Sequence, residues 1–183
     1  MAGSGSPGVS MEEVEVFLTA EQIASRVQEL GAEIRAHYGD EPVLCLGILK
    51  GSVLFLADLM RAMPGEVACD FLGVSSYEGT ESSGVVRITH DLKSPIEGRH
   101  VLIVEDIVDT GLTLQFLLDT LQVRQPASLR VAALLDKPSR RTATVPVDWV
   151  GFSIEDHFVV GYGLDLDERF RNLPFVGLYR GPG

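Results

Sequence analysis

Residues 101–113, which read VLIVEDIVDTGLT, constrain the fold of this chain more than any other segment. The first four are apolar and suit a short buried strand. Two adjacent acids, Glu105 and Asp106, follow where that strand is expected to end, and a small polar turn containing Gly111 comes next. Leucines at helical spacing then begin at Leu114. The segment therefore predicts a buried strand, an acidic pair, a tight turn and a helix in direct succession.

This succession suits a sugar phosphate. The start of a helix offers free N–H groups and the positive end of the helix dipole to a phosphate monoester. Adjacent carboxylates can hold ribose hydroxyls, either directly or through a divalent metal ion, which leaves Asp109 available for chemistry. The simpler alternative is an acidic loop that caps a helix and binds nothing, since Asp is favoured at helix starts.

Hydrophobic periodicity predicts alternating helices and strands along the rest of the chain. The expected helices are 20–38, 53–63 and one that begins near 114 and ends before 126; the expected strands are 43–48, 67–75, 85–89, 101–104, 129–135, 147–154 and 176–179. Such alternation is typical of an α/β domain with a largely parallel sheet. Ligands of these sheets bind at the carboxyl ends of strands. Lys50, Asp106 and Lys137 each follow an apolar run, so we expect them to face one cleft.

Composition narrows the class of protein. The 183 residues predict one domain over 11–183, preceded at 1–10 by a disordered Gly/Ser-rich tail or a cloning remnant that lacks the features of a secretory signal. No apolar run approaches the ~20 residues that cross a bilayer, so no membrane partner is expected. The formal net charge of −11 disfavours nonspecific binding to nucleic acid. Cys45 and Cys69 lie in apolar runs and predict no disulfide framework, which favours a cytoplasmic location.

The string 105–113 is similar to the binding signature of the type I phosphoribosyltransferases, which hold 5-phosphoribosyl-1-pyrophosphate (PRPP). Its Glu-Asp, two apolar residues and Asp-Thr-Gly resemble the hypoxanthine-guanine branch of that family. The resemblance implies the type I phosphoribosyltransferase fold, an α/β fold with a mostly parallel central sheet flanked by helices, a small hood and a mobile loop. It implies purine salvage, with Mg²⁺-dependent transfer of the phosphoribosyl group from PRPP to N9 of hypoxanthine or guanine to give IMP or GMP and pyrophosphate. It also implies a homodimer or homotetramer.

Within this string the resemblance assigns a role to each polar residue. Asp109 matches the acid/base that handles the purine proton. Glu105 and Asp106 match the pair that contacts the ribose hydroxyls and Mg²⁺. The 5-phosphate cradle would consist of Asp109, Thr110, Gly111, Leu112 and Thr113. Some family members carry a basic residue where Leu112 stands, so phosphate capture here would depend on backbone N–H groups and the threonine hydroxyls.

Residues for the pyrophosphate end of PRPP come from two other motifs. The pair Lys50 and Gly51 resembles the family's pyrophosphate loop, in which a Lys-Gly peptide can be cis, although an ordinary strand-to-helix turn would read the same way. By resemblance, Arg171 would bind pyrophosphate, and Asp165 would hold a second Mg²⁺ beside the purine.

Segment 75–84 is polar and contains glycines near its middle and end. Ser76 and Tyr77 match the Ser-Tyr pair of the mobile lid that closes over the site in this family. Such a lid excludes water, which would otherwise attack an oxocarbenium-like centre. A plain hairpin loop is the alternative for this segment.

The later part of the chain supplies residues that would recognise the base. Lys137 would donate to the exocyclic 6-oxygen and so select 6-oxopurines, unless it is one more basic residue in a surface cluster. Arg140 and Arg141, its neighbours, are expected to be solvated. Phe158 would stack on the purine face and Val159 would present backbone groups to its edge, whereas an aromatic residue in an apolar run is otherwise usually core.

Two rival functions remain open from the sequence. A phosphoribosyltransferase for another base, such as xanthine or a pyrimidine, would share the fold, and a panel of bases would separate the two. The other rival is a regulator that senses PRPP and binds RNA or DNA. The net charge of −11, fewer than twenty residues ahead of the first helix and the Asp at position 109 favour an enzyme over a regulator.

Overall fold

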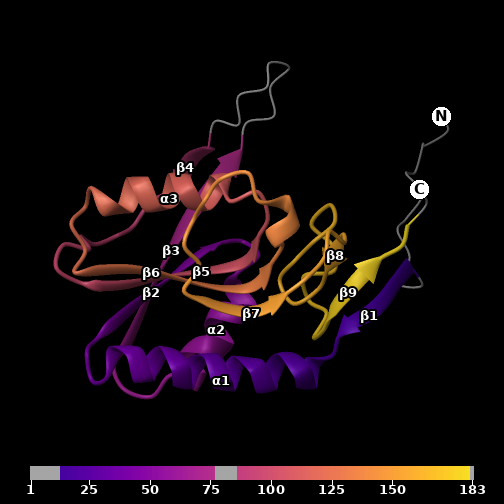
Figure 1. Ribbon diagram of the computed structural model, residues 1–183, viewed down its shortest axis with the longest axis horizontal. Coiled ribbons are helices and arrows are strands. Elements are labelled where there is room, and N and C mark those ends of the chain that lie inside the picture. Colours follow the sequence, from indigo (N-terminus) through magenta and orange to yellow (C-terminus); the bar gives the residue numbers. More distant parts are fainter. Residues whose placement is uncertain (1–12, 77–85, 182–183) are drawn as a thin grey trace, which may run out of the picture.

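The larger of two β-sheets forms the centre of the molecule (Figure 1). The computed structural model describes residues 13–76 and 86–181. Six strands lie in the order β4-β3-β2-β5-β6-β7, and every neighbouring pair is parallel except β3 and β4. These strands are β2 (Val43–Leu49), β3 (Val67–Ser76), β4 (Val86–His90), β5 (His100–Val108), β6 (Ser128–Asp136) and β7 (Trp149–Ser153). The predicted α/β fold with a mostly parallel sheet is confirmed.

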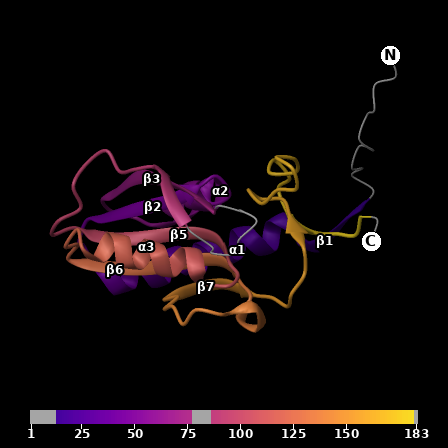
Figure 2. The same ribbon diagram turned by 90° about the horizontal axis from the view of Figure 1, so that it is seen from above.

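Helices cover both faces of this sheet (Figures 1 and 2). They are α1 (Ala20–Tyr38), α2 (Val53–Ala62) and α3 (Leu112–Gln122). Side chains of β5 point alternately into two cores: Leu102 and Val104 join the cluster under α1 and α2, whereas Val101 and Ile103 join the cluster under α3. Burial on both faces explains why this strand reads as a continuous apolar run.

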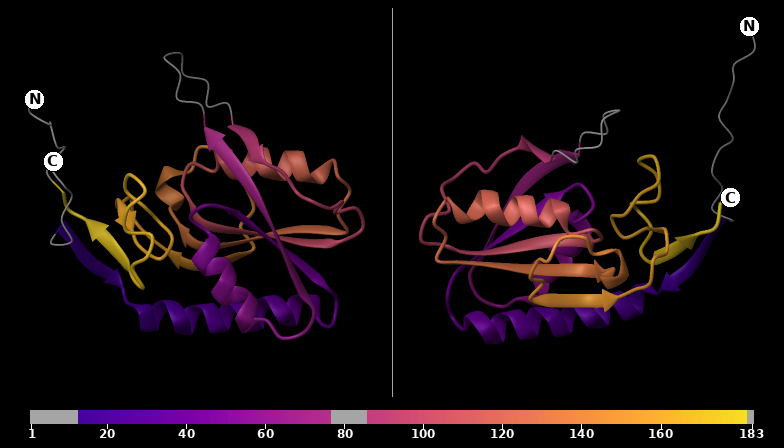
Figure 3. Two further views of the ribbon diagram at one scale, coloured as in Figure 1. Left: turned by 180° about the vertical axis from the view of Figure 1, so that it is seen from behind. Right: turned by 45° about the horizontal axis from the view of Figure 1, so that its top comes forward.

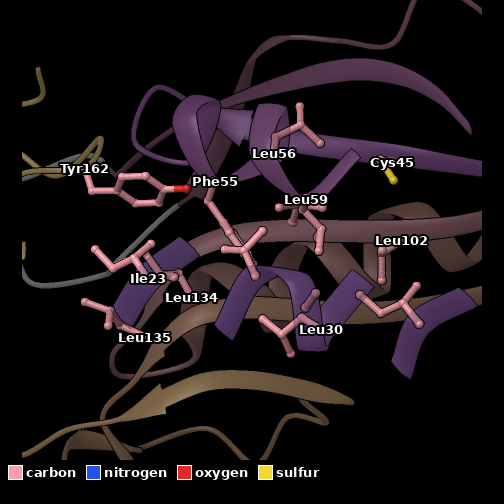
Figure 4. Packing of buried hydrophobic residues seen from close by; sticks show 14 of the residues in the cluster. Ile23, Leu30, Cys45, Phe55, Leu56, Leu59, Leu102, Leu134, Leu135 and Tyr162 are labelled. Atoms are coloured by element: carbon pink, nitrogen blue, oxygen red, sulfur yellow. The ribbon is translucent and has the colours of Figure 1, made fainter. Parts of the chain in front are cut away.

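Large apolar side chains join α1 and α2 to the sheet (Figure 4). Ile23 of α1 and Phe55 and Leu59 of α2 lie in one cluster, and each is at most 1% exposed. Gly31 of α1 allows the two helices to approach closely, because a Cβ at this position would lie 2.6 Å from the backbone oxygen of Ala62.

A second, antiparallel sheet lies beyond one end of the central sheet (Figures 1 and 3). Its strands, in spatial order, are β1 (Val14–Leu18), β9 (Val176–Tyr179) and β8 (Val159–Val160). This sheet is the small hood that the sequence resemblance implies. Tyr162 joins the hood to the body, because its hydroxyl donates to the Asp58 carboxylate of α2 at 2.6 Å. Burial raises the pKa of Tyr162 above its usual value, and Figure 4 shows its ring pointing toward α2.

Strand β5 is longer than the sequence predicts. It continues to Val108 because β6 pairs with it to that residue, whereas pairing with β2 stops at Val104. Glu105 and Asp106 therefore lie inside the strand, not after it, at the point where its β2 side becomes unpaired. The expectation that the strand ends at Val104 is wrong for this reason.

Other elements agree with prediction more closely. The predicted helix 20–38 is observed, and Thr19 caps it by accepting a hydrogen bond from the backbone N–H of Gln22 at 3.2 Å.

Two strands of the smaller sheet, β1 and β8, were not predicted from the sequence. β8 has only two residues, so it carries no periodicity. Both cysteines are free; Cys45 is buried and Cys69 is exposed. Within the described ranges, no helix has the length and apolar character needed to cross a membrane.

The order of the central sheet changes direction between β2 and β5. From β2 the sheet extends to β3 and β4, and from β5 it extends to β6 and β7 on the other side. Open α/β sheets bind ligands outside the carboxyl ends of strands at such a point. The residues after β2 and at the end of β5 are therefore the first candidates for a functional site.

Candidate active site

Three segments meet around the carboxylate of Asp106. Gly51, two residues after β2, lies so close that a Cβ on it would be 1.6 Å from Asp106 Oδ2. Gly163 of the hood segment packs on Gly51 in turn, since a Cβ on Gly163 would be 2.0 Å from the carbonyl oxygen of Gly51. The φ of Gly163, +101°, is also one that L side chains rarely adopt. The structure thus brings the predicted pyrophosphate loop directly against the predicted acidic pair.

Burial dominates the electrostatics of the two acids. Glu105 is 6% exposed, and burial together with the neighbouring Asp106 raises its pKa well above the usual range. Burial also raises the pKa of Asp106 to about 6, against the opposing effects of the Ile107 N–H, which donates to Oδ1 at 2.8 Å, and of the Arg171 guanidinium. Negative charge is therefore costly at both acids in the ligand-free protein, and a cation placed beside them would relieve that cost.

A cavity of about 100 Å³ opens between the end of β5 and the start of α3. It is lined by Glu105, Ile107, Val108, Asp109, Thr110, Gly111, Thr113 and Leu114. Gly111 occupies the N-cap with a φ of +85°, so it turns the chain into α3 without a side chain over the first N–H groups of the helix. Most of the predicted phosphate cradle lines this cavity, but Leu112, which is 47% exposed, does not.

The side chains of Asp109 and Lys137 belong to one polar network. Arg140 donates from Nε to Asp109 Oδ1 at 3.2 Å and also lies 3.7 Å from a carboxylate oxygen of Asp156. Asp156 accepts a hydrogen bond from Lys137 Nζ at 3.3 Å. The sequence left open whether Lys137 is one more basic residue in a surface cluster. In the structure Lys137 is only 7% exposed, so it is buried. The structure therefore links the predicted base-selecting lysine to the predicted acid/base through Asp156 and Arg140.

The prediction that Arg140 and Arg141 are solvated is wrong for Arg141. Arg140 is exposed as predicted, although it pairs with Asp109. The Arg141 side chain is 18% exposed, pairs with Asp136 and donates to the carbonyl oxygen of Asp109 at 2.6 Å. The short 3₁₀ helix Pro138–Arg140 directs the chain back across the end of β5 and brings both arginines to Asp109. A Lys-Arg-Arg cluster in the sequence gives no sign of such a return.

Basic side chains from the loop after β2 and from the hood line a second cavity, of about 350 Å³. It is lined by Leu49, Lys50, Gly73, Val74, Thr89, His90, Glu168 and Arg171. Arg171 donates to the Gly163 carbonyl oxygen at 2.7 Å and pairs with Asp165 at 2.9 Å. Glu168, for which the sequence predicted no role, pairs with both Lys50 at 2.9 Å and Arg171 at 3.2 Å. Lys50 and Arg171, the two basic residues predicted for pyrophosphate, thus line one cavity and pair with one carboxylate.

Two loop predictions have different outcomes. The non-proline cis peptide lies between Leu49 and Lys50, one bond before the Lys-Gly peptide that the resemblance indicated. Of the predicted lid pair, Ser76 is the last residue of β3, where its backbone pairs with Val86. Tyr77 lies outside the described residues.

The predicted base-stacking residue stands apart from the network of Asp109 and Lys137. Phe158 is 54% exposed, so the alternative that it belongs to the core is wrong. Its ring contacts Tyr179 edge-on, with 6.1 Å between ring centroids. The small cavity that Phe158 lines contains neither Lys137 nor Asp109. Val159 follows in β8, where it is 7% exposed and pairs with β9.

Comparison with known proteins identifies the family. The family model described as "Phosphoribosyl transferase domain" matches residues 13–167, a range that contains Gly51, Asp106, Asp109, Lys137 and Gly163. The chain belongs to the phosphoribosyltransferase family.

Relatives of this phosphoribosyltransferase are phosphoribosyltransferases of purine bases. A hypoxanthine-guanine phosphoribosyltransferase of Bacillus subtilis is 47% identical over 167 residues, which cover 91% of this chain and 93% of the relative. One from Mycobacterium avium is 53% identical over 169 residues, which cover 88% and 83%. The crystal structure of a hypoxanthine phosphoribosyltransferase from Staphylococcus aureus matches with a TM-score of 0.89 and 46% identity over 96% of each chain. The type I phosphoribosyltransferase fold implied by the sequence is confirmed by this match.

Proposed function

We propose that this phosphoribosyltransferase transfers the phosphoribosyl group of PRPP to N9 of hypoxanthine or guanine, giving IMP or GMP and pyrophosphate. The observation that carries the proposal is the grouping, at the end of β5, of the buried Glu105, the partly buried Asp106 and the cavity-lining turn with Asp109, with Lys137 beside them. The named activity of relatives at 47% and 53% identity supports the same substrates.

PRPP would lie across the two cavities. The hydroxyls of Thr110 and Thr113 and the first N–H groups of α3 would hold its 5-phosphate, since these groups surround the cavity after β5. Lys50 and Arg171, which line the other cavity, would hold its pyrophosphate. The ribose between these two ends would face Asp106 and its neighbour in β5.

The reaction exchanges one bond at C1 of the ribose for another. The bond from C1 to the pyrophosphate oxygen breaks, and pyrophosphate leaves with the electron pair, its charge held by Lys50 and Arg171. The bond from purine N9 to C1 forms as Asp109 takes the proton of that nitrogen. Glu105 and Asp106 face the positive charge that develops on the ribosyl group in the transition state.

Mg²⁺ fits Glu105 and Asp106. Both acids have raised pKa values that a cation would relieve, and carboxylate oxygens are ligands that Mg²⁺ prefers. Within the described ranges no three His, Cys, Asp or Glu side chains form a ready-made metal site. That suits an ion held by one or two carboxylates together with substrate oxygens. Asp165 would hold a second ion only after exchanging its pairing with Arg171. When bound, Mg²⁺ supplies positive charge for the pyrophosphate.

Gly51→Ala should lower kcat/KM for PRPP by roughly 10- to 100-fold, because its methyl group would force the adjacent Asp106 carboxylate to move. The Cβ would otherwise lie 1.6 Å from Oδ2. Steady-state kinetics with PRPP as the varied substrate measure the effect. Gly39→Ala is the control, because nothing lies within 4 Å of a Cβ there; its positive φ makes it costly for stability but not for the site. A Gly51→Ala enzyme with wild-type kcat/KM would contradict the close approach.

Lys137→Met should raise the KM for hypoxanthine and guanine by about 10- to 100-fold, because the 6-oxygen of the base would lose its buried donor. The KM for PRPP should change by no more than about twofold. Lys93→Met, the same substitution at an exposed position, should leave both constants unchanged. Equal losses for the base and for PRPP would show that Lys137 does not select the base.

A panel of bases tests the proposed function itself. The wild-type protein should form nucleotide from hypoxanthine and guanine with PRPP and Mg²⁺, and it should discriminate against adenine, which lacks the 6-oxygen. If the protein turned over only xanthine or only a pyrimidine, the proposed substrate would be wrong, and the protein would be a phosphoribosyltransferase for that base. Light scattering would test the homodimer or homotetramer, and cell fractionation the cytoplasmic location, which both remain predictions.

A further inference from the structure

A separate segment holds the backbone of the turn that carries Asp109. The N–H groups of Thr142 and Ala143 both donate to the carbonyl oxygen of Thr110, at 2.9 and 3.0 Å, and Thr142 Oγ1 lies 3.3 Å from the same oxygen. Gly111 lies against the same segment, since a Cβ on it would be 2.9 Å from the carbonyl oxygen of Ala143. The shape of the turn is therefore fixed from residues that follow β6, more than thirty positions along the chain.

The Arg141 side chain adds a link from this segment to the backbone of Asp109. One guanidinium nitrogen donates to the Asp109 carbonyl oxygen at 2.6 Å, and the other pairs with Asp136 at the end of β6. The side chains of Arg141 and Asp136 are 18% and 14% exposed, so the link is shielded from solvent. A guanidinium can serve two acceptors at once in a fixed geometry, which an ammonium group does less well.

Arg141 differs from Arg140 in what it touches. Arg140 contacts the carboxylate of Asp109, whereas Arg141 contacts its backbone. Arg141 does not line the cavity after β5. Its effect on a bound phosphate must therefore pass through the backbone of the turn.

We propose that Arg141 is a positioning residue for the 5-phosphate end of the substrate. It ties the Asp109 carbonyl to the end of β6 and so fixes where the N–H groups and hydroxyls of residues 110–113 point. The inference rests on the proposed function, because it assumes that this turn holds the 5-phosphate. It predicts that ligands carrying that phosphate depend on Arg141, whereas ligands without it do not.

The test compares Arg141→Met and Arg141→Lys with Arg130→Met. Arg130 makes a comparable pair with Asp148, at 2.8 Å, near the opposite end of β6, so its loss removes an arginine–aspartate pair without touching the turn. The measured quantities are the KM for PRPP, the KM for hypoxanthine, the Kd of IMP and ribose 5-phosphate, the inhibition constant of pyrophosphate and the thermal midpoint.

Arg141→Met should weaken PRPP, IMP and ribose 5-phosphate by about 10- to 100-fold, because misplaced groups lose orientation. The KM for hypoxanthine and the inhibition constant of pyrophosphate should stay within about twofold. Arg141→Lys should fall between this variant and wild type, and Arg130→Met should keep all ligand constants near wild type even if its thermal midpoint falls.

Unchanged binding of IMP and ribose 5-phosphate to Arg141→Met would overturn the positioning role, as would an equal weakening of all ligands, hypoxanthine and pyrophosphate included. If Arg141→Met does not fold, the same comparison on Arg141→Lys decides. Wild-type protein that binds neither PRPP nor ribose 5-phosphate would overturn the proposed function and the positioning role with it. Ribose 5-phosphate carries no base, so the positioning test remains valid if the enzyme uses a different base.

Discussion

Asp109→Asn is expected to lower kcat for IMP formation by about 10²- to 10⁴-fold, the usual contribution of a positioned acid/base. The amide has nearly the size of the carboxylate. Its oxygen can still accept the hydrogen bond that Arg140 now donates to Asp109 at 3.2 Å. The KM for PRPP should therefore change by no more than about threefold, since the loss falls on the transition state and not on binding. Single-turnover kinetics with saturating hypoxanthine and PRPP measure the chemical step directly.

Asp119→Asn is the matched control for this change. Asp119 is exposed on α3, the helix that follows the same turn, so the variant makes the same chemical change outside the cavity. It should turn over like wild type. An Asp109→Asn enzyme whose kcat stays within about threefold of wild type would show that another group takes the N9 proton.

Asp106→Asn is expected to change activity and stability in opposite directions. It should lower kcat/KM for PRPP by about 10²- to 10³-fold, because the site loses a carboxylate for the ribose and for Mg²⁺. In the ligand-free protein it should raise the free energy of unfolding by about 1–2 kcal/mol at pH 8, because a partly buried charge disappears. The amide oxygen can keep the hydrogen bond from the Ile107 N–H, now 2.8 Å long, so little is lost.

The gain in stability should depend on pH. The pKa of Asp106 is raised from the usual 3.8 to about 6 in the folded protein. A raised carboxyl pKa means that the protonated form favours folding, so this contribution is complete below pH 3.8 and is lost as the pH rises through about 6. Wild type and Asp106→Asn should therefore differ most at pH 8 and approach each other near pH 4.

Urea unfolding in EDTA at several pH values tests this expectation. Asp70→Asn is the control, because Asp70 likewise accepts a hydrogen bond from the next backbone N–H, that of Phe71 at 2.8 Å, but lies outside the site. It should give no gain in stability at pH 8. An Asp106→Asn protein that is less stable than wild type at pH 8, or that keeps full turnover, would contradict the role given to this acid.

Local patterns predict the elements that are buried on both faces or clearly periodic. The apolar run of β5, the leucine stripe of α3 and the capped helix α1 all lie where the sequence indicates. The end of β5 was misplaced because it depends on how far β6 continues to pair, which is a property of the partner strand. β8 was missed because two residues carry no period and are defined only by pairing with β9.

The candidate site shows the same division. Glu105, Asp106 and Asp109 could be found from the sequence because their spacing belongs to one continuous strand and turn. Arg141 and Glu168 could not, since each acts through a contact with residues far away in the chain, Asp109 and Lys50. Such contacts are created by reverse turns, and composition alone does not indicate where those turns lead.

The central claim is that the end of β5 binds PRPP and that Asp109 completes the transfer. The most direct test is ³¹P NMR of a mixture of PRPP, hypoxanthine and the wild-type protein, recorded with and without Mg²⁺. The same mixture with Asp109→Asn in place of the wild-type protein is the comparison. The account predicts equal amounts of pyrophosphate and IMP from the wild-type protein, only with Mg²⁺, and almost none from Asp109→Asn in the same time. PRPP that stays intact with wild-type protein, Mg²⁺ and every base in the panel would contradict it.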